Sequence, residues 1–274
     1  MTSVLVKKSG GDLEPFEPSK LIESLQRAGA KEEIIRGIVS EVSNSLKEGM
    51  STHEIYKTAF ELLRKTARPL AARYSLKRAV LELGPTGFPF EDFLAEIFRA
   101  KGFSVWTRQT LEGKCVSHEV DLVAERAGRK IIGEAKFHNE LGLKSDLKVA
   151  LYVSARVEDI RNKNPENKIE GLLITNTKFT KAATEYANCA GLTLIGWSSP
   201  RYGNLHDLIE ETGAHPITSL TSLSRSEKFE LIARGVMLCR DLGMRREELV
   251  RLNISEKKIK EAIAEGEELC HHHL

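Results

Sequence analysis

Residues 118–136 carry the sequence HEVDLVAERAGRKIIGEAK, which predicts two β-strands joined by a tight turn. Side chains alternate between the two faces of a strand. In the first strand Asp121 therefore lies on one face, and the apolar side chains lie on the other: Val120, Leu122 and Ala124. In the second strand Glu134 and Lys136 are two residues apart and share a face. The hairpin thus presents three charged groups beside a core-forming surface.

A turn at Ala127-Gly128 places Asp121 directly opposite Glu134. Paired Cβ atoms lie roughly 4.5–5.5 Å apart, so two carboxylates at these positions can reach one ion. Carboxylate and water ligands suit Mg²⁺ or Mn²⁺, and Lys136 would orient the attacking water and stabilise charge on a phosphate. The pattern predicts metal-dependent phosphodiester hydrolysis. The spacing is short and common, and a solvated hairpin without chemistry also satisfies it.

A helix is predicted just before the hairpin, ending at Gly102. Its inward residues recur at helical spacing: Phe90, Phe93, Leu94, Ile97 and Phe98. Glu91 borders this apolar stripe and is expected to reach the site as an additional acidic group, as a direct or water-mediated metal ligand.

The pattern of elements divides the chain into three parts. Residues 1–84 predict a short strand pair and four helices, and Gly84-Pro85-Thr86-Gly87 is the expected linker. Residues 85–212 alternate strands with helices, which predicts an α/β sheet with some parallel pairing. Residues 213–274 are helical and charged, either as a cap or dimerisation element or as helix-hairpin-helix modules. No internal repeat is evident.

Composition indicates a globular protein of the cytoplasm. Apolar residues make up 41% and charged residues 29%, and no apolar run is long enough to span a membrane. The four cysteines lie far apart, which argues against a structural zinc site or a disulfide framework. Because the net charge is only +2, any nucleic-acid surface must gather its basic residues on one face.

Several segments in residues 88–210 resemble the Mrr-like restriction endonucleases. They are FEDF from Phe90, KGF from Lys101, VDLVA from Val120, EAK from Glu134, GLLITN from Gly171, FTKAA from Phe179 and GLTLI from Gly191. The resemblance implies a mixed sheet flanked by helices, and a Mg²⁺-dependent PD-(D/E)xK deoxyribonuclease of the type IV restriction kind. Asp121, Glu134 and Lys136 fall on the functional positions of that family. Many members carry Gln where this chain has Glu134.

Residues 4–84 resemble the ATP-cone domain. The similarity runs through VKKSGG from Val6, LEPF from Leu13, SKL from Ser19, GMST from Gly49 and LAAR from Leu70. It implies an adenine-nucleotide site for ATP or dATP, with Lys8, Glu14, Lys20 and Thr52 at the ligand and with Val6 and Lys7 near it. The usual Arg-Asp-Gly turn of the family is Ser9-Gly10-Gly11 here, which leaves the choice of nucleotide open.

Together these features predict a DNA endonuclease regulated by ATP or dATP and acting as a homo-oligomer. Two alternatives remain open. One is a non-catalytic, nucleotide-sensing regulator that only binds DNA, although such a binder has no need of facing carboxylates that repel phosphate. The other is a nuclease that processes RNA.

Overall fold

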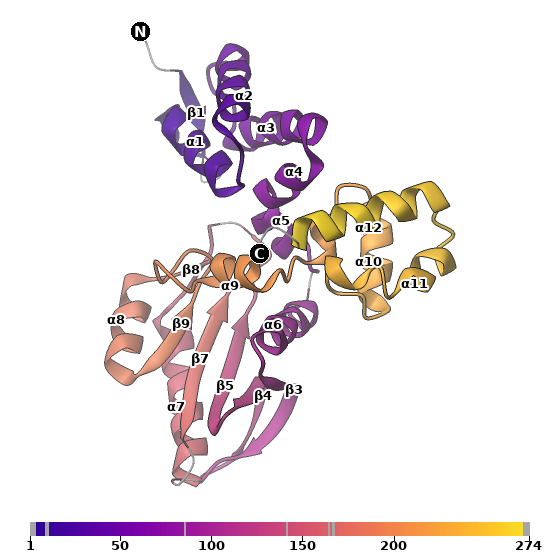
Figure 1. Cartoon of the computed structure of the whole chain (residues 1–274). Coiled ribbons are helices and arrows are strands. Elements are labelled where there is room, and N and C mark those ends of the chain that lie inside the picture. Colours follow the sequence, from indigo (N-terminus) through magenta and orange to yellow (C-terminus); the bar gives the residue numbers. More distant parts are fainter. Residues whose placement is uncertain are drawn as a thin grey trace.

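The computed structural model describes residues 4–8, 11–84, 86–140, 142–163, 165 and 168–270. Ser9, Gly10 and Pro85, which belong to the expected turn and linker, lie outside these described residues. Figure 1 shows three parts: N-terminal helices at one end, a sheet with its helices at the other, and C-terminal helices beside α5. No helix in the described part of the chain is long and apolar enough to cross a membrane.

The N-terminal part is a strand pair followed by five helices. β1 (Leu5–Lys7) pairs antiparallel with β2 (Leu13–Pro15). The helices follow in order: α1 (Pro18–Arg27), α2 (Glu32–Ser45), α3 (Thr52–Thr66), α4 (Arg68–Tyr74) and α5 (Leu76–Leu81). The capping box at Ser51 and Glu54 is confirmed, and each side chain accepts the other residue's backbone N–H. The fourth predicted helix is instead two short helices that meet at Ser75.

A five-stranded mixed sheet forms the centre of the second part, in the order β3-β4-β5-β7-β9. Its strands are β3 (Ser104–Glu112), β4 (Ser117–Arg126), β5 (Arg129–Lys136), β7 (Ile169–Thr175) and β9 (Leu192–Ile195). β3, β4 and β5 are antiparallel, whereas β5, β7 and β9 run parallel. Two further short strands, β6 (Lys144–Ser145) and β8 (Lys178–Phe179), pair with each other. The predicted α/β sheet with parallel pairing is confirmed.

Helices cover both faces of the sheet. α6 (Phe88–Ala100) and α9 (Leu205–Thr212) share one apolar cluster with the sheet, and α7 (Leu147–Lys163) and α8 (Lys181–Ala190) share another. The helix predicted before the hairpin is α6, and its inward apolar residues are buried. Three buried residues that precede the expected linker, Leu76, Val80 and Leu83, also belong to the α6 cluster. The core of the sheet therefore extends back into α5.

The β4–β5 hairpin has the register that the sequence predicts. Leu122 pairs with Gly133, and Arg126 pairs with Arg129 across the turn. Both turn residues, Ala127 and Gly128, have positive φ angles, of 49° and 77°. Such angles match the twist of a two-residue hairpin turn. The predicted turn is thus confirmed.

One part of the predicted alternation is wrong. Leu122 and Ala124 pack beneath α6, but Val120 packs with Val123 in the cluster beneath α7. In the neighbouring strand, Arg108 has a φ of 52° and lies between the residues paired with Leu122 and Val120.

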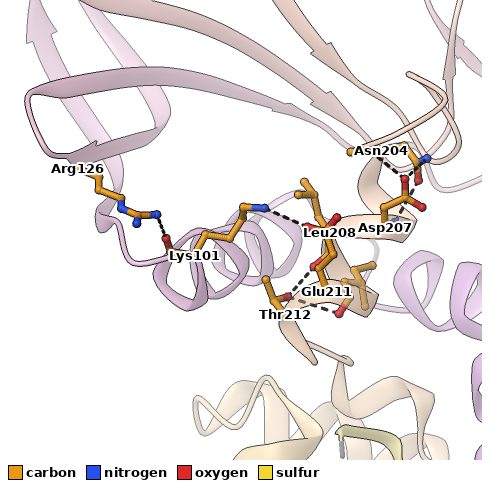
Figure 2. Close-up of polar contacts among 9 residues, drawn as sticks. Lys101, Arg126, Asn204, Asp207, Leu208, Glu211 and Thr212 are labelled. Atoms are coloured by element: carbon orange, nitrogen blue, oxygen red, sulfur yellow. Dashed lines mark hydrogen bonds and ion pairs between the residues drawn. The ribbon is translucent and has the colours of Figure 1, made fainter. Parts of the chain in front are cut away.

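The last turn of α6 is fixed to both the hairpin and α9 (Figure 2). Arg126 Nη1 donates to the Lys101 carbonyl at 2.6 Å, and Lys101 Nζ contacts Glu211 Oε2 at 3.1 Å. Asn204 starts α9 by accepting the Asp207 N–H at 3.1 Å. These contacts hold α6, and with it Glu91, in a defined position over the hairpin.

The C-terminal part is helical, as predicted. Its elements are the 3-10 turns η1 (Ile217–Ser219) and η2 (Cys239–Asp241) and the helices α10 (Arg225–Ala233), α11 (Arg246–Arg251) and α12 (Glu256–Cys270). It is joined to α5 by a hydrogen bond of 2.6 Å from Thr218 Oγ1 to the Ala79 carbonyl.

A short repeat in this part escaped the sequence analysis. α10 and α11 end in the same way, with a left-handed residue followed by a buried β-branched one. At the end of α10 these residues are Gly235 and Val236, and at the end of α11 they are Asn253 and Ile254. Asn replaces Gly in the second copy, so the repeat is not visible as a glycine pattern.

We predict opposite effects for two helical Gly→Ala substitutions. A Cβ on Gly266 in α12 would lie 2.9 Å from the Cys239 carbonyl oxygen, whereas a Cβ on Gly37 in α2 meets nothing within 4 Å. Gly266→Ala should lower the free energy of unfolding by about 1–3 kcal/mol. Gly37→Ala should raise it by about 1 kcal/mol through helix propensity. Urea unfolding of the full chain measures both, and equal effects would contradict the close packing of α12 on η2.

Candidate active site

Asp121 lies where the ladder between β4 and β5 ends. Its Oδ2 accepts the backbone N–H of Ala135 at 2.7 Å, so its carboxylate adjoins the residue that follows Glu134. The last ladder pair is Leu122 with Gly133, one step before Asp121 and Glu134. The register therefore brings these two residues to neighbouring positions on adjacent strands.

Glu134 is paired with an arginine that the sequence analysis did not anticipate. Arg156, from α7, donates through Nη1 to the Glu134 carboxylate and through Nη2 to the Tyr152 hydroxyl. The two charged side chains are only 20% and 10% exposed, so this ion pair is largely shielded from water. The Arg156 guanidinium also lies 4.5 Å from the centre of the Tyr152 ring.

Glu91 reaches the same region from α6. It is buried, with 8% of its surface exposed, and its Oε2 accepts from Arg108 Nη1 at 3.2 Å. Arg108 also contacts Asp92 Oδ1 at 2.8 Å. The left-handed backbone of Arg108 thus accompanies a side chain that joins β3 to the acidic residues of α6.

The electrostatics show that the three acidic groups affect one another. Burial raises the pKa of Asp121, of Glu134 and of Glu91, and it is the largest cause in each case. The negative charge of Asp121 is the second cause that raises the pKa of both Glu134 and Glu91. Three carboxylates with raised pKa values form a site that positive charge stabilises.

Lys136 occupies the last position of β5, where its register partner is Thr175 of β7. Its charge lowers the pKa of Glu134 and that of His138, which places the ammonium near both groups. Lys136 makes no direct ion pair with any residue that the structure describes. It is exposed and available to a ligand at the end of the sheet.

The donor set suits a hard cation that retains water ligands. Within the described ranges no group of three or more His, Cys, Asp or Glu side chains is arranged to hold a metal ion alone. Mg²⁺ usually binds through one or two carboxylates together with water and substrate phosphate. Asp121 and Glu134 satisfy this requirement chemically, and for Glu134 an incoming cation competes with Arg156.

Two residues of the site were missed for different reasons. Arg156 lies on the face of α7 that also carries the buried residues Val153, Val157 and Ile160. A cation inside an apolar stripe is a signal that could have been read from the sequence. Arg108 gave no such signal, because nothing local in the sequence predicts a left-handed arginine in a strand.

The residues expected at the nucleotide are only partly brought together. A cavity of about 210 Å³ is lined by Val6, Lys8, Lys20 and Thr52, with aromatic walls from Tyr56 and Tyr74. Glu14 forms an ion pair with Lys8 at 3.1 Å without lining the cavity, and Lys7 does not line it either. Lys20 contacts Glu17 at 2.7 Å.

Comparison with protein families assigns all three parts of the chain. Residues 4–80 match the ATP cone domain, and residues 85–198 match a restriction endonuclease domain of the Mrr type. Residues 215–270 match a family described as AF1548-like, C-terminal.

Comparison with individual proteins identifies an archaeal relative. An uncharacterized protein of Archaeoglobus fulgidus is 36% identical over 177 residues, which span 64% of this chain and 99% of the relative. The crystal structure of a protein of unknown function, AF1548, is similar with a TM-score of 0.55 and 34% identity, over 69% of this chain and 98% of that one. MspJI restriction endonuclease bound to a 27-mer oligonucleotide has a TM-score of only 0.32 at 16% identity, over 58% of this chain and 39% of that one. The chain therefore belongs to the family of the Archaeoglobus protein, and it consists of an ATP cone domain, a restriction endonuclease domain and an AF1548-like C-terminal domain.

Proposed function

We propose that the protein is a Mg²⁺-dependent DNA endonuclease that hydrolyses phosphodiester bonds, with Mn²⁺ as an alternative cofactor. One observation carries the proposal: Asp121, Glu134 and Glu91 come from separate elements, burial raises the pKa of all three, and the charge of Asp121 further raises those of Glu134 and Glu91. Membership of the restriction endonuclease family supports DNA as the substrate.

Each residue has a distinct role in the proposal. Asp121 and Glu134 would hold the cation, which supplies Lewis-acid stabilisation of the phosphate and activates water. Lys136 would position the nucleophile and the scissile phosphate, because its ammonium is exposed beside Glu134. Glu91 would assist from α6, where Arg108 fixes its carboxylate at 3.2 Å.

One observation favours the competing function, a DNA-binding regulator without cleavage. In the structure Arg156 is paired with Glu134, and a permanent pair would occupy the carboxylate that the cation needs. Only the cleaving enzyme needs a divalent cation at Glu134. Plasmid cleavage with and without metal, and the effect of Mg²⁺ on the unfolding midpoint, therefore distinguish the two functions.

We expect supercoiled plasmid to be nicked or linearised by the wild type with Mg²⁺ or Mn²⁺, and left intact with a chelator. Lys136→Ala should reduce cleavage by about 10²–10³-fold, because it removes the cation that faces the reacting phosphate. Lys130→Ala is the matched control, since Lys130 lies at the other end of β5 and contacts Glu125 at 3.0 Å. Equal nicking by Asp121→Ala and wild type would reject the site, and cleavage of RNA alone would change the substrate class.

In the absence of metal, Asp121→Asn should stabilise the protein at pH 7. A carboxyl group whose folded-state pKa is raised costs stability as the pH rises through that pKa, and the amide retains an acceptor for the Ala135 N–H. The expected gain is about 1 kcal/mol, or roughly 2–4 °C in the unfolding midpoint. The difference should vanish below the pKa of the carboxyl group, where the wild type is also neutral.

Glu134→Gln, in contrast to Asp121→Asn, should destabilise the protein. It leaves the shielded guanidinium of Arg156 without its carboxylate, so the unfolding midpoint should fall. Addition of Mg²⁺ should raise the midpoint of the wild type and leave that of Asp121→Asn almost unchanged. If Mg²⁺ shifts both proteins equally, Asp121 is not a ligand.

For the ATP cone domain we propose binding of ATP or dATP, which changes the assembly of a homo-oligomer or the access of DNA to the nuclease. Lys8, Lys20 and Thr52 would contact the nucleotide, with Val6 and Lys7 nearby and with Glu14 acting through Lys8. The cavity of about 210 Å³ is smaller than the usual range for drug-sized ligands, so part of the nucleotide would extend outward.

We expect ATP or dATP to change the cleavage rate, the molar mass measured by light scattering, or both. Lys20→Ala should abolish the response, because it removes a phosphate-binding charge, whereas Lys31→Ala, beyond α1 and outside the cavity, should preserve it. Rates and molar masses that stay constant across the titration would contradict nucleotide regulation.

A further inference from the structure

A second cavity lies between the ATP cone domain and the nuclease domain. Its volume is about 680 Å³, within the usual range for small-molecule sites. The cone domain contributes residues of α1, α4 and α5, and the nuclease domain contributes β8 and the segment 197–207. None of the residues assigned to catalysis or to the first nucleotide cavity by the family resemblance lines it.

The walls of this interdomain cavity are strongly basic. Five cationic side chains line it: Arg27, Arg73, Lys77, Lys178 and Arg201. Within the described residues none of the five forms an ion pair with a carboxylate. Asp207 is the one acidic residue among the lining residues of the described chain, and it already accepts from Gly203 at 2.9 Å and Asn204 at 2.8 Å. The cavity therefore has a large excess of positive charge.

The polar groups of the cavity are incompletely satisfied. Arg73 Nη2 donates to the Leu269 carbonyl at 3.3 Å, but its Nε is buried and has no hydrogen-bond partner among the described residues. Burial, Lys178 and Arg27 all lower the pKa of Lys77. Burial and the neighbouring cations disfavour the charged form of Lys77, so a bound anion would stabilise the protein by offsetting that positive charge.

Aromatic rings adjoin the charged groups. Lys77 Nζ lies 5.9 Å from the centre of the Trp197 ring, which packs edge-on against His206 at 5.6 Å between ring centres. Flat aromatic surfaces next to guanidinium and ammonium groups suit a ligand with both a planar ring and phosphates.

We propose that this cavity binds a small ligand with several phosphate groups, of the nucleoside polyphosphate class, and that the ligand bridges the two domains. The cavity is partly open to solvent, and its volume of about 680 Å³ matches a small molecule rather than a DNA duplex. The site does not depend on the proposed cleavage reaction.

The first nucleotide cavity adjoins this one, and a backbone hydrogen bond links its wall to the segment that follows β7. Tyr74 and Ser24 line it and also line the first nucleotide cavity. On the nuclease side the Trp197 N–H donates to the Thr177 carbonyl at 2.8 Å, two residues beyond the register partner of Lys136. A ligand held here touches the connection between nucleotide recognition and the end of β5.

Calorimetry of the full chain with inorganic tripolyphosphate, without divalent metal, tests the proposal. Lys178 and Arg201 are exposed, so the double variant Lys178→Ala/Arg201→Ala should fold normally. It should raise the Kd for tripolyphosphate at least about tenfold, because a charge-assisted hydrogen bond is worth about that factor. The control Lys181→Ala/Arg225→Ala removes the same charge elsewhere and should leave the Kd unchanged.

Three outcomes would overturn the proposal. The first is an absence of binding to the wild type. The second is an equal Kd for the two double variants, or loss of binding in Lys20→Ala alone. The third is a selective loss of metal-free duplex DNA binding in Lys178→Ala/Arg201→Ala with unchanged tripolyphosphate binding, which would assign the cavity to the DNA backbone.

Discussion

Buried negative charge is the constraint on which the nuclease domain depends. Asp121 and Glu134 adjoin each other because the Ala127-Gly128 turn fixes the register of β4 and β5, and Glu91 joins them from α6. Each carboxylate is then stabilised by a different partner: a backbone N–H, the guanidinium of Arg156 and that of Arg108. Removing those partners would leave like charges in a shielded place, which a folded chain tolerates poorly.

This arrangement explains why the surrounding elements are held so firmly. Arg126 fixes the end of α6 to the hairpin, and Lys101 joins the same end to α9. Without such anchors α6 could withdraw and relieve the repulsion at Glu91. Arg156, in turn, links α7 on the opposite face to β5. Helices on both faces of the sheet therefore contribute charged groups to the same end of it: Arg156 from α7 and Glu91 from α6.

The hairpin, its register and the alternation of strands and helices could be predicted, because they depend on turn residues and on local periodicity. The position of Val120 could not, because it departs from the alternation of its own strand and nothing local in the sequence signals the change. The ion pair of Arg156 depends on how α7 crosses the sheet, and only its place in an apolar stripe hinted at it. The repeated helix ends were hidden because Asn253 replaces a glycine.

The extension of the nuclease core into α5 limits how freely the domains can be exchanged. Leu76, Val80 and Leu83 are buried against α6, and Ala79 accepts the hydrogen bond that attaches the C-terminal helices. α5 therefore packs with both the nuclease domain and the C-terminal part, and it is more than a connecting segment. Recombination that replaces the ATP cone domain must break the chain before α5, or the incoming segment must restore the same apolar surface and the same carbonyl acceptor.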